Sequence, residues 1–323
     1  MHSAAEKQAA EWYISSDELL RRPKETGVAV DPENPAEIDD AIDVTGNSDG
    51  TYRVAIHISD AGLLEKDTPL VDQARQKGWS FYGSSVNGLD PMLPLSISKD
   101  KLSLNSNHHG LGAPAVTLCM RLDPVTRQVN DLDIYQSRLV SCDAISYREL
   151  AKRYVGGDSK ARMIIDISRL LNKDIGRPSN LPNSYCHQAI GEYMLLANRI
   201  IAETMSKRSV PWLYRYHQTR APLARRNLDV NSYVEAERDL LDHIGLAQYS
   251  TAPLRHEGLN FKPYTHFTSP LRRFPDLVNH QLLHAMLGGS PLPYELAELE
   301  QIAGELAKKT AKSLGLLALK SAA

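Results

Sequence analysis

The segment Asp31-Pro32-Glu33-Asn34-Pro35-Ala36-Glu37-Ile38-Asp39-Asp40-Ala41-Ile42 contains the most informative pattern in the chain. Alternating apolar residues on either side of it predict two short strands, one before and one after. Two prolines and an asparagine between the strands predict an irregular loop. That loop carries four closely spaced carboxylates, those of Asp31, Glu37, Asp39 and Asp40.

Crowded carboxylates repel one another, and this repulsion raises their pKa values. A divalent cation removes the penalty, and oxygen ligands on a loop suit Mg²⁺, which keeps several waters and completes its shell with a phosphate. Such a cation orients a water and stabilises charge on a phosphodiester. The alternative is a solvated acidic turn, which is common because Asp and Asn are frequent turn formers.

A second segment reads Tyr264-Thr265-His266-Phe267-Thr268-Ser269-Pro270-Leu271-Arg272-Arg273-Phe274-Pro275-Asp276-Leu277. Ser269 is a suitable N-cap and Pro270 a suitable first residue for a helix. A helix N-terminus favours an anion, so we expect Arg272 to clamp a phosphate there. The alternative is an ordinary capped helix with solvated arginines.

Composition narrows the class of protein. The 323 residues are 24% charged and 42% hydrophobic, which excludes a disordered chain and allows one large domain or two. A formal net charge of −2 excludes a general basic coat, so a nucleic-acid site must be local. The three cysteines, Cys119, Cys142 and Cys186, form neither a disulfide ladder nor a CxxC metal pair. No apolar run is long enough to span a membrane, and we expect a cytoplasmic protein.

The order of predicted elements indicates an α+β fold. Alternating residues over 51–58 and 116–122 predict strands in the first half, and a short strand is expected around Leu132 and Ile134. The second half favours helices: periodic apolar residues predict them near 163–171, 190–205 and 234–244, from Ser269 to Gly288, and at about 294–312. No nucleotide-cofactor motif interrupts this order.

Together the two segments resemble the signature motifs of the RNB catalytic domain, the family of ribonuclease II, ribonuclease R and Dis3. The acidic motif of that family runs Asp-Pro-x-x-Ala-x-Asp-x-Asp-Asp-Ala, and Asp31, Asp39 and Asp40 match it in register. In the second motif only Leu271 and Phe274 differ, both conservatively. The resemblance covers about residues 25 to 290 and includes the stretches 54–60, 91–94, 192–198, 214–217 and 256–259.

The resemblance implies an RNB-type domain with a mixed or antiparallel sheet core and a helical second half. It implies an exoribonuclease II-like hydrolase that degrades single-stranded RNA from the 3′ end, uses Mg²⁺ (with Mn²⁺ as a possible substitute) and releases 5′-nucleoside monophosphates. Asp39 and Arg272 are then expected to be catalytic, and Asp31, Glu37 and Asp40 to hold the metal. The expected RNA-binding residues are Tyr82, Tyr264, His266, Thr268, Ser269 and Arg273.

The sequence departs from the family pattern at several points. Glu37 stands where the family usually has Asp, and two extra residues separate Tyr82 from Pro91. The family's late-helix Glu has no counterpart in register, since Glu305 is displaced from it. We expect an N-terminal extension or helix over 1–25 and an RNB-like domain over 26–323, without accompanying OB-fold domains. RNA binding is then expected to be weak unless a protein partner or neighbouring chain supplies such modules.

Three hypotheses follow. The first is the metal-dependent 3′→5′ exoribonuclease described above. The second is a catalytically weakened RNB domain that acts as an RNA-binding or protein-partner module. The third is a hydrolase for a different phosphodiester, such as DNA ends or a small nucleotide, which the ribose 2′-hydroxyl would separate from the first. Tyr82 also has a second interpretation, as a core aromatic beside Trp79 and Phe81.

Overall fold

The structure is a computed structural model, and it describes residues 3–83, 88–171, 182–217 and 246–321. The chain forms two compact units. The first comprises Met1–Ala197 and Phe267–Pro293, and the second comprises Asn198–His266 and Tyr294–Ala323. The acidic loop and the segment 267–277 therefore belong to the same unit, although more than two hundred positions separate them in the chain.

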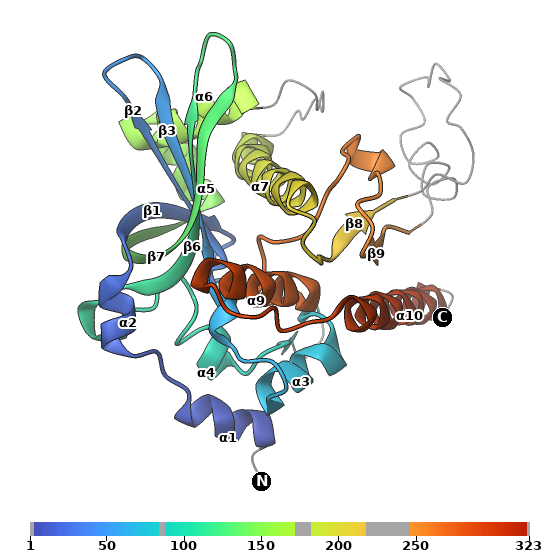
Figure 1. Ribbon diagram of the computed structural model, residues 1–323. Coiled ribbons are helices and arrows are strands. Elements are labelled where there is room, and N and C mark those ends of the chain that lie inside the picture. The colour runs from blue at the N-terminus through green and yellow to red at the C-terminus, as the bar shows by residue number, and fades with distance from the viewer. Residues whose placement is uncertain (1–2, 84–87, 172–181, 218–245, 322–323) are drawn as a thin grey trace, which may run out of the picture. The chain divides into compact units, whose positions relative to one another are not determined.

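A closed five-stranded barrel is the centre of the first unit (Figure 1). Its strand order is β1-β2-β3-β6-β7, with antiparallel neighbours except for the parallel pair of β1 and β7 that closes it. The mixed sheet of an α+β fold is therefore confirmed. The strands are β1 (Lys24–Asp31), β2 (Asp40–Gly46), β3 (Tyr52–Ser59), β6 (Ala113–Leu122) and β7 (Val129–Ser146).

Barrel closure explains why the burial pattern is denser than simple alternation predicts. Six consecutive residues of β3, 54–59, are buried, because one face lines the barrel and the other is covered. His57 is among them, and its Nδ1 lies 2.8 Å from the Thr117 hydroxyl. Burial lowers the pKa of His57 to about 4, so the imidazole is neutral and acts as part of the core.

Helices and short strands surround the barrel. The N-terminal segment is docked: the Lys101 ammonium donates to the carbonyl of Ala9 at 2.7 Å and also to that of Trp12, at the C-terminal end of α1 where a cation is favourable. The elements of this unit are α1 (Ala4–Glu11), α2 (Ser16–Arg21), η1 (Ala61–Leu63), α3 (Pro69–Lys77), β4 (Phe81–Tyr82), β5 (Leu89–Asp90), α4 (Leu95–Ser98), η2 (His108–Gly110), α5 (Tyr147–Val155), α6 (Ser159–Leu171) and α9 (Phe274–Gly288).

The second unit is built around a small antiparallel sheet of two strands, β8 (Tyr214–Tyr216) and β9 (Gln248–Ser250). Helix α10 (Leu296–Ser321) packs against β9. The short helix η4 (Glu257–Leu259) follows β9 in the chain and belongs to the same unit. The long helix α7 (Pro182–Lys207) contains the boundary between the two units. The helix predicted over 234–244 lies outside the described residues.

Three predicted elements differ in extent from those observed. The short strand expected around Leu132 and Ile134 is the first part of the 18-residue β7, because this strand pairs with β6 along its first half and continues to pair with β1 along its second. The C-terminal helix, predicted at about 294–312, runs from Leu296 to Ser321. The helix predicted to begin at Ser269 begins at Phe274, for a reason given with the site below.

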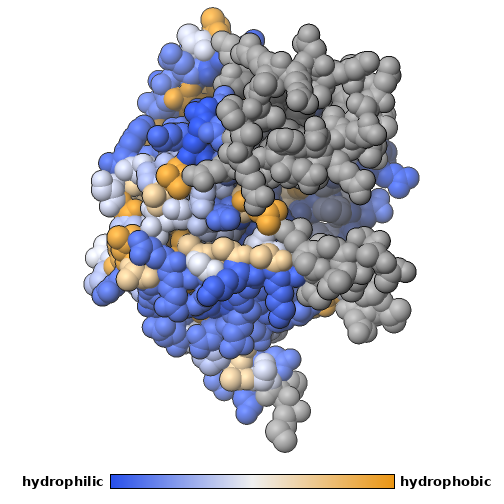
Figure 2. All heavy atoms as spheres, turned by 90° about the vertical axis from the view of Figure 1, so that its right-hand side faces the viewer, coloured by the Kyte–Doolittle hydropathy of each residue, from blue (hydrophilic) through white to orange (hydrophobic). Residues whose placement is uncertain are grey.

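The coloured surface in Figure 2 is mainly hydrophilic, with hydrophobic residues in small separate groups. No helix in the described ranges has the length and apolar character that crossing a bilayer requires.

Candidate active site

The acidic loop joins β1 to β2 and is anchored at its centre by Ile38. This side chain is buried in a core cluster with Leu104 and Leu139. The backbone of Ile38 is also fixed, because its N–H donates to the Ser103 hydroxyl at 2.9 Å and its carbonyl accepts from Leu104 N–H at 3.0 Å. The neighbours of Ile38 therefore have fixed positions, and both are buried: Glu37 is 7% exposed and Asp39 is 4% exposed.

Asp39 holds the arginine segment. Its Oδ2 accepts from Arg272 Nε at 2.9 Å, and its Oδ1 accepts from the backbone N–H of Leu271, also at 2.9 Å. Arg272 Nη2 in turn donates to the Ser269 hydroxyl at 2.9 Å. The guanidinium is thus held on two sides, and part of it still reaches solvent, where it is available to an anion.

The predicted helix start at Ser269-Pro270 is wrong. These residues form a turn, and α9 begins at Phe274 with Pro275 in its first turn and Arg273 as N-cap. The turn covers residues 270–272, and Arg273 is extended and bridges to Trp79. On either side of this bridge, Ser80 N–H donates to the Arg272 carbonyl at 2.9 Å and Phe274 N–H to the Gly78 carbonyl at 2.8 Å. Arg272 is therefore placed by Asp39 and this short pairing, and not by a helix N-terminus.

Three of the carboxyls resist ionisation. Burial, followed by repulsion from Asp39, raises the pKa of Asp31 to about 6. Burial also raises the pKa of Glu37, and burial together with the charges of Asp31 and Asp39 holds the pKa of Asp40 well above its ordinary value. This is the pattern of a site that gains from a positive charge placed among its carboxylates.

The donor set fits a hard divalent cation. Asp31 lies close enough to Asp40 for its charge to raise the pKa of Asp40, and both supply the hard carboxylate oxygens that such a cation prefers. Within the described part of the chain no three metal-binding side chains converge as a preformed cage. Mg²⁺ does not require one, because it is usually held by one or two carboxylates, waters and a substrate phosphate.

Glu37 contacts the predicted base-stacking residue. The Tyr82 hydroxyl donates to Glu37 Oε1, and burial together with this bond raises the pKa of Tyr82. Tyr82 as a whole residue remains 54% exposed. The interpretation of Tyr82 as a core aromatic is therefore wrong, because β4 lies on the surface.

The remaining predicted RNA-binding residues belong to different units: Thr268, Ser269 and Arg273 lie in the first, and Tyr264 and His266 in the second. Thr268 and Ser269 are buried, and Arg273 donates to Asp276 Oδ1 through Nε at 3.1 Å and Nη2 at 2.6 Å. In the second unit Tyr264 is 4% exposed, and its hydroxyl accepts from Asn198 at 3.1 Å. His266 Nδ1 lies 2.8 Å from the Tyr249 hydroxyl in the same unit. Their RNA contacts remain predictions.

Sequence reasoning missed three contributors. The backbone N–H of Leu271 binds Asp39, which no side-chain pattern reveals. Asp276 is fully buried and accepts from Ser269 N–H at 2.9 Å as well as from Arg273, so it shapes the turn; its position three residues after Arg273 was an available signal. Tyr147 stacks on His187 with ring centroids 3.6 Å apart, and the charges of Asp40 and Asp31 act on it.

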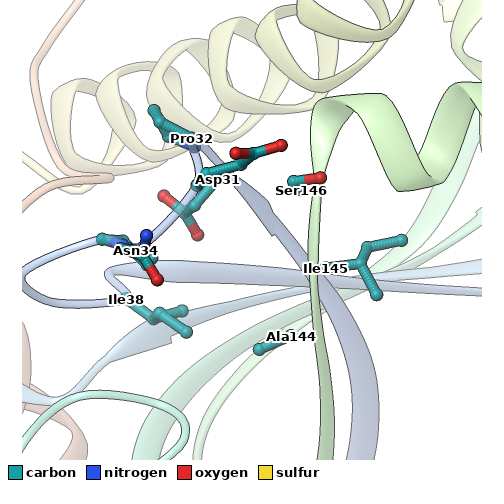
Figure 3. A pocket seen from close by; sticks show the side chains of 9 residues that line it. Asp31, Pro32, Asn34, Ile38, Ala144, Ile145 and Ser146 are labelled. Carbon is teal, nitrogen blue, oxygen red and sulfur yellow. The ribbon is translucent and has the colours of Figure 1, made fainter.

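A pocket of about 390 Å³ lies beside Asp31. Figure 3 shows Asp31, Pro32 and Asn34 on one side of this pocket and Ala144, Ile145 and Ser146 of β7 on the other. The parallel pairing of β1 with β7 explains the juxtaposition, because Asp31 and Ser146 are partners in register. The charged residues of its lining, Asp31 and Glu33, are both acidic, so the pocket favours a neutral or cationic group over a free phosphate.

Comparison with known proteins gives a consistent result. The RNB domain model matches residues 23–175 and 169–289. The chain is 26% identical over 373 residues to Ribonuclease R of Aquifex aeolicus, covering 94% of this chain and 52% of that protein. It is 26% identical over 349 residues to Ribonuclease R of Thermotoga maritima, covering 87% of this chain and 48% of that protein. The chain thus spans about half the length of these relatives.

Solved structures share the fold. The RNase R of Mycoplasma genitalium, in complex with ribose-methylated single-stranded RNA, superimposes with a TM-score of 0.80 at 21% identity and covers 98% of this chain and 60% of its own. Yeast Ssd1, described as a pseudonuclease, gives a TM-score of 0.75 at 18% identity, with coverage of 91% and 44%. Since the family model matches most of the sequence and the site residues lie on the matched fold, the chain belongs to the RNB domain family.

Proposed function

We propose that the chain is a hydrolytic 3′→5′ exoribonuclease that acts on single-stranded RNA and releases 5′-nucleoside monophosphates with the help of Mg²⁺. The observation that carries the proposal is the position of Arg272, which Asp39 holds beside carboxyls with raised pKa values. A fixed cation beside a cation-seeking acidic cluster suits a phosphodiester, whose charge increases in the transition state. The ribonuclease names of the relatives support the choice of RNA.

Each residue has a separate part in this proposal. Asp31 and Asp40 hold the cation, which when bound polarises the phosphate and lowers the pKa of a water. Arg272 contacts the scissile phosphate and stabilises its developing charge, and Asp39 keeps the guanidinium in place. Mn²⁺ is expected to substitute for Mg²⁺, since it accepts the same oxygen ligands. A cytoplasmic location and an RNA-binding partner remain further predictions.

A second candidate is a weakened RNB domain that binds RNA or a protein without cutting. Two observations favour it: Glu37 occupies an aspartate position of the family motif, and α10 places no Glu in the family's register. The similarity to Ssd1 shows that this fold also occurs in a protein described as a pseudonuclease. The intact pairing of Asp39 with Arg272 favours the active enzyme.

The test is a gel assay with a 5′-labelled single-stranded RNA of about 30 nucleotides, long enough for the several-nucleotide footprint of single-strand binding proteins. The proposed enzyme shortens the RNA stepwise from its 3′ end with Mg²⁺ and leaves it intact with chelator. A DNA oligomer of the same sequence is the comparison for the third hypothesis. RNA that stays intact with Mg²⁺ while it binds the protein would support the weakened domain.

A further inference from the structure

The contact between Glu37 and Tyr82 gives Glu37 a task that the acidic motif does not suggest. Glu37 is buried on a loop fixed on its C-terminal side by the hydrogen bonds of Ile38, so the direction of its side chain is constrained. Oε1 accepts a hydrogen bond from the Tyr82 hydroxyl. This oxygen is therefore engaged with the aromatic ring of a different strand.

The exposed ring depends on this bond. Tyr82 lies in β4, a strand of two residues whose partner β5 is equally short. Gly83 N–H donates to the Gly88 carbonyl at 2.7 Å, and Phe81, beside Tyr82 in β4, is 56% exposed. A surface tyrosine retains rotamer freedom unless its polar end is fixed. The buried carboxylate fixes the Tyr82 ring at the edge of the site.

The length of the Glu37 side chain is what allows the contact. An aspartate at this position would be shorter by one C–C bond of about 1.5 Å. Hydrogen bonds between oxygens require a separation of about 2.5–3.0 Å, so an aspartate on the same backbone would not reach the hydroxyl. The extra methylene of Glu37 therefore lets its carboxylate reach the Tyr82 hydroxyl, and it adds no ligand for a cation.

The position of the ring indicates what it would contact. The Tyr82 hydroxyl is bonded to Glu37, two residues before the Asp39 that holds Arg272, and the charges of Arg272 and Asp39 both act on it. Its hydroxyl end therefore lies near Arg272, which is proposed to contact the scissile phosphate. An exposed aromatic face next to a phosphate site suits a nucleobase, because every base has a π-face that stacks without regard to sequence.

We infer that Glu37 is a positioning residue, which holds the Tyr82 ring as a stacking platform for the terminal base and is not a ligand of the cation. The inference rests on the proposed function, because it assigns a part of the same site. It separates the four carboxylates into two pairs: Asp31 and Asp40 face the cation, whereas Glu37 and Asp39 each hold a side chain that contacts RNA.

Two conservative substitutions give opposite expectations for a positioning residue and for a ligand. Glu37→Gln keeps the length and an acceptor oxygen, so it preserves the bond from Tyr82, but it removes the charge that Mg²⁺ prefers. Glu37→Asp keeps the charge but does not reach the ring. If Glu37 positions Tyr82, Gln is tolerated and Asp is not. If Glu37 is a ligand, Asp is tolerated and Gln is not.

The first measurement is RNA binding in chelator, where no cutting occurs, with 2-aminopurine as the 3′-terminal base. Stacking on Tyr82 quenches its fluorescence. We expect Glu37→Asp and Tyr82→Phe each to weaken binding about 10- to 150-fold and to reduce the quenching, the scale for one hydrogen bond to a charged group. The double variant should be no worse than either single one, and Glu37→Gln should bind like the parent protein. Tyr13→Phe, at an exposed tyrosine in the N-terminal segment, is the matched control.

The second measurement is Mn²⁺ binding by electron paramagnetic resonance, which needs no RNA. Positioning predicts that Glu37→Gln lowers the Mn²⁺ affinity much less than Asp31→Asn, which removes a proposed ligand, whereas a ligand role predicts similar losses for the two variants. A loss with Glu37→Gln as large as that with Asp31→Asn, or additive effects of Glu37→Asp and Tyr82→Phe on RNA binding, would overturn the inference. If binding behaves as expected but no nucleotide is released with Mg²⁺, the proposed exoribonuclease fails while the positioning role stands.

Discussion

Arg272 and Asp39 are 233 positions apart in the chain, and they form a salt bridge in which Nε lies 2.9 Å from Oδ2. The second carboxylate oxygen accepts from the backbone N–H of Leu271 at 2.9 Å. One aspartate therefore fixes both the backbone and the side chain of the arginine segment. With both oxygens engaged, Asp39 is better suited to holding Arg272 than to binding a cation.

Asp39→Asn should slow cleavage by up to about 10²- to 10³-fold, the effect of losing Arg272 itself, while largely retaining RNA binding. The amide keeps a similar shape but loses the charge that balances Arg272, so the guanidinium is no longer fixed on the phosphate. Nucleotide release and filter binding measure the two effects on one preparation. Asp49→Asn, at an exposed aspartate of the β2–β3 turn, is the matched control and should behave like the parent protein. Equal loss of binding and cleavage in Asp39→Asn would argue against this division of roles.

Arg272→Ala should lower the turnover rate by about 10²- to 10³-fold, the range for loss of one charge-stabilising donor. Arg272→Lys should also be impaired, since an ammonium cannot contact Asp39, Ser269 and a phosphate with the geometry of a guanidinium. Single-turnover cleavage at saturating protein measures the effect on chemistry. Arg121→Ala, on the outer part of the barrel, is the control, and an Arg272→Ala variant as fast as this control would exclude Arg272 from the reaction.

Asp31→Asn should stabilise the protein in chelator and remove its stabilisation by Mg²⁺. The pKa of Asp31 is raised from 3.8 to about 6 by burial and then by Asp39, so the folded state binds a proton that the unfolded state has released in this window. In the absence of metal, stability therefore falls as the pH rises from about 4 to about 6, and ionised Asp31 is unfavourable above it.

At pH 7.5 the expected gain for Asp31→Asn is about 1–3 kcal/mol, since one pKa unit corresponds to about 1.4 kcal/mol. Urea unfolding in chelator and with Mg²⁺ measures both effects. Mg²⁺ should raise the midpoint of the parent protein and leave that of the variant unchanged. A variant that is less stable than the parent in chelator would show that Asp31 has a structural role instead.

Arg22→Met should destabilise the first unit by about 3–5 kcal/mol, the cost of leaving a buried charge uncompensated. Arg22 Nη1 donates to Asp60 Oδ2 at 2.7 Å, and the Asp60 side chain is fully buried. Despite burial, the bonds from His284 and Arg22 hold the pKa of Asp60 below its usual range, so Asp60 stays charged. Urea unfolding measures the loss, and Arg22→Met/Asp60→Asn should recover part of it. If Arg22→Met unfolds at the same urea concentration as the parent protein, the pair is not stabilising.

The fold class was predictable from the sequence because local patterns determine it. Alternation over 51–58 and 116–122 gave β3 and β6, and apolar periodicity gave α6 and α7. Closure of the barrel was not predictable, because the parallel pairing of β1 with β7 joins residues more than a hundred positions apart. The helix start at Phe274 was missed because Ser269-Pro270 is a stronger local signal than the long-range pairing of Arg272 and Phe274 with Gly78–Ser80.

In the candidate site, too, the contacts between distant segments could not be predicted from local sequence patterns. The two motifs identified the residues, and the structure brings Asp31, Asp39, Asp40 and Arg272 together. The bond between Tyr82 and Glu37 depends on where a short hairpin lies over the acidic loop, so the motif alone assigned Glu37 to the cation. A substitution of Asp by Glu was visible in the sequence, but its consequence required the position of the second partner.

The most direct test of the account is product analysis of uniformly labelled single-stranded RNA incubated with Mg²⁺, by thin-layer chromatography, with Asp39→Asn as the paired protein. 5′-Nucleoside monophosphates should appear from the earliest times with the parent protein, chelator should prevent their release, and Asp39→Asn should slow it by up to about 10²- to 10³-fold. Products other than 5′-monophosphates, or equal release by the parent protein and Asp39→Asn, would contradict the account.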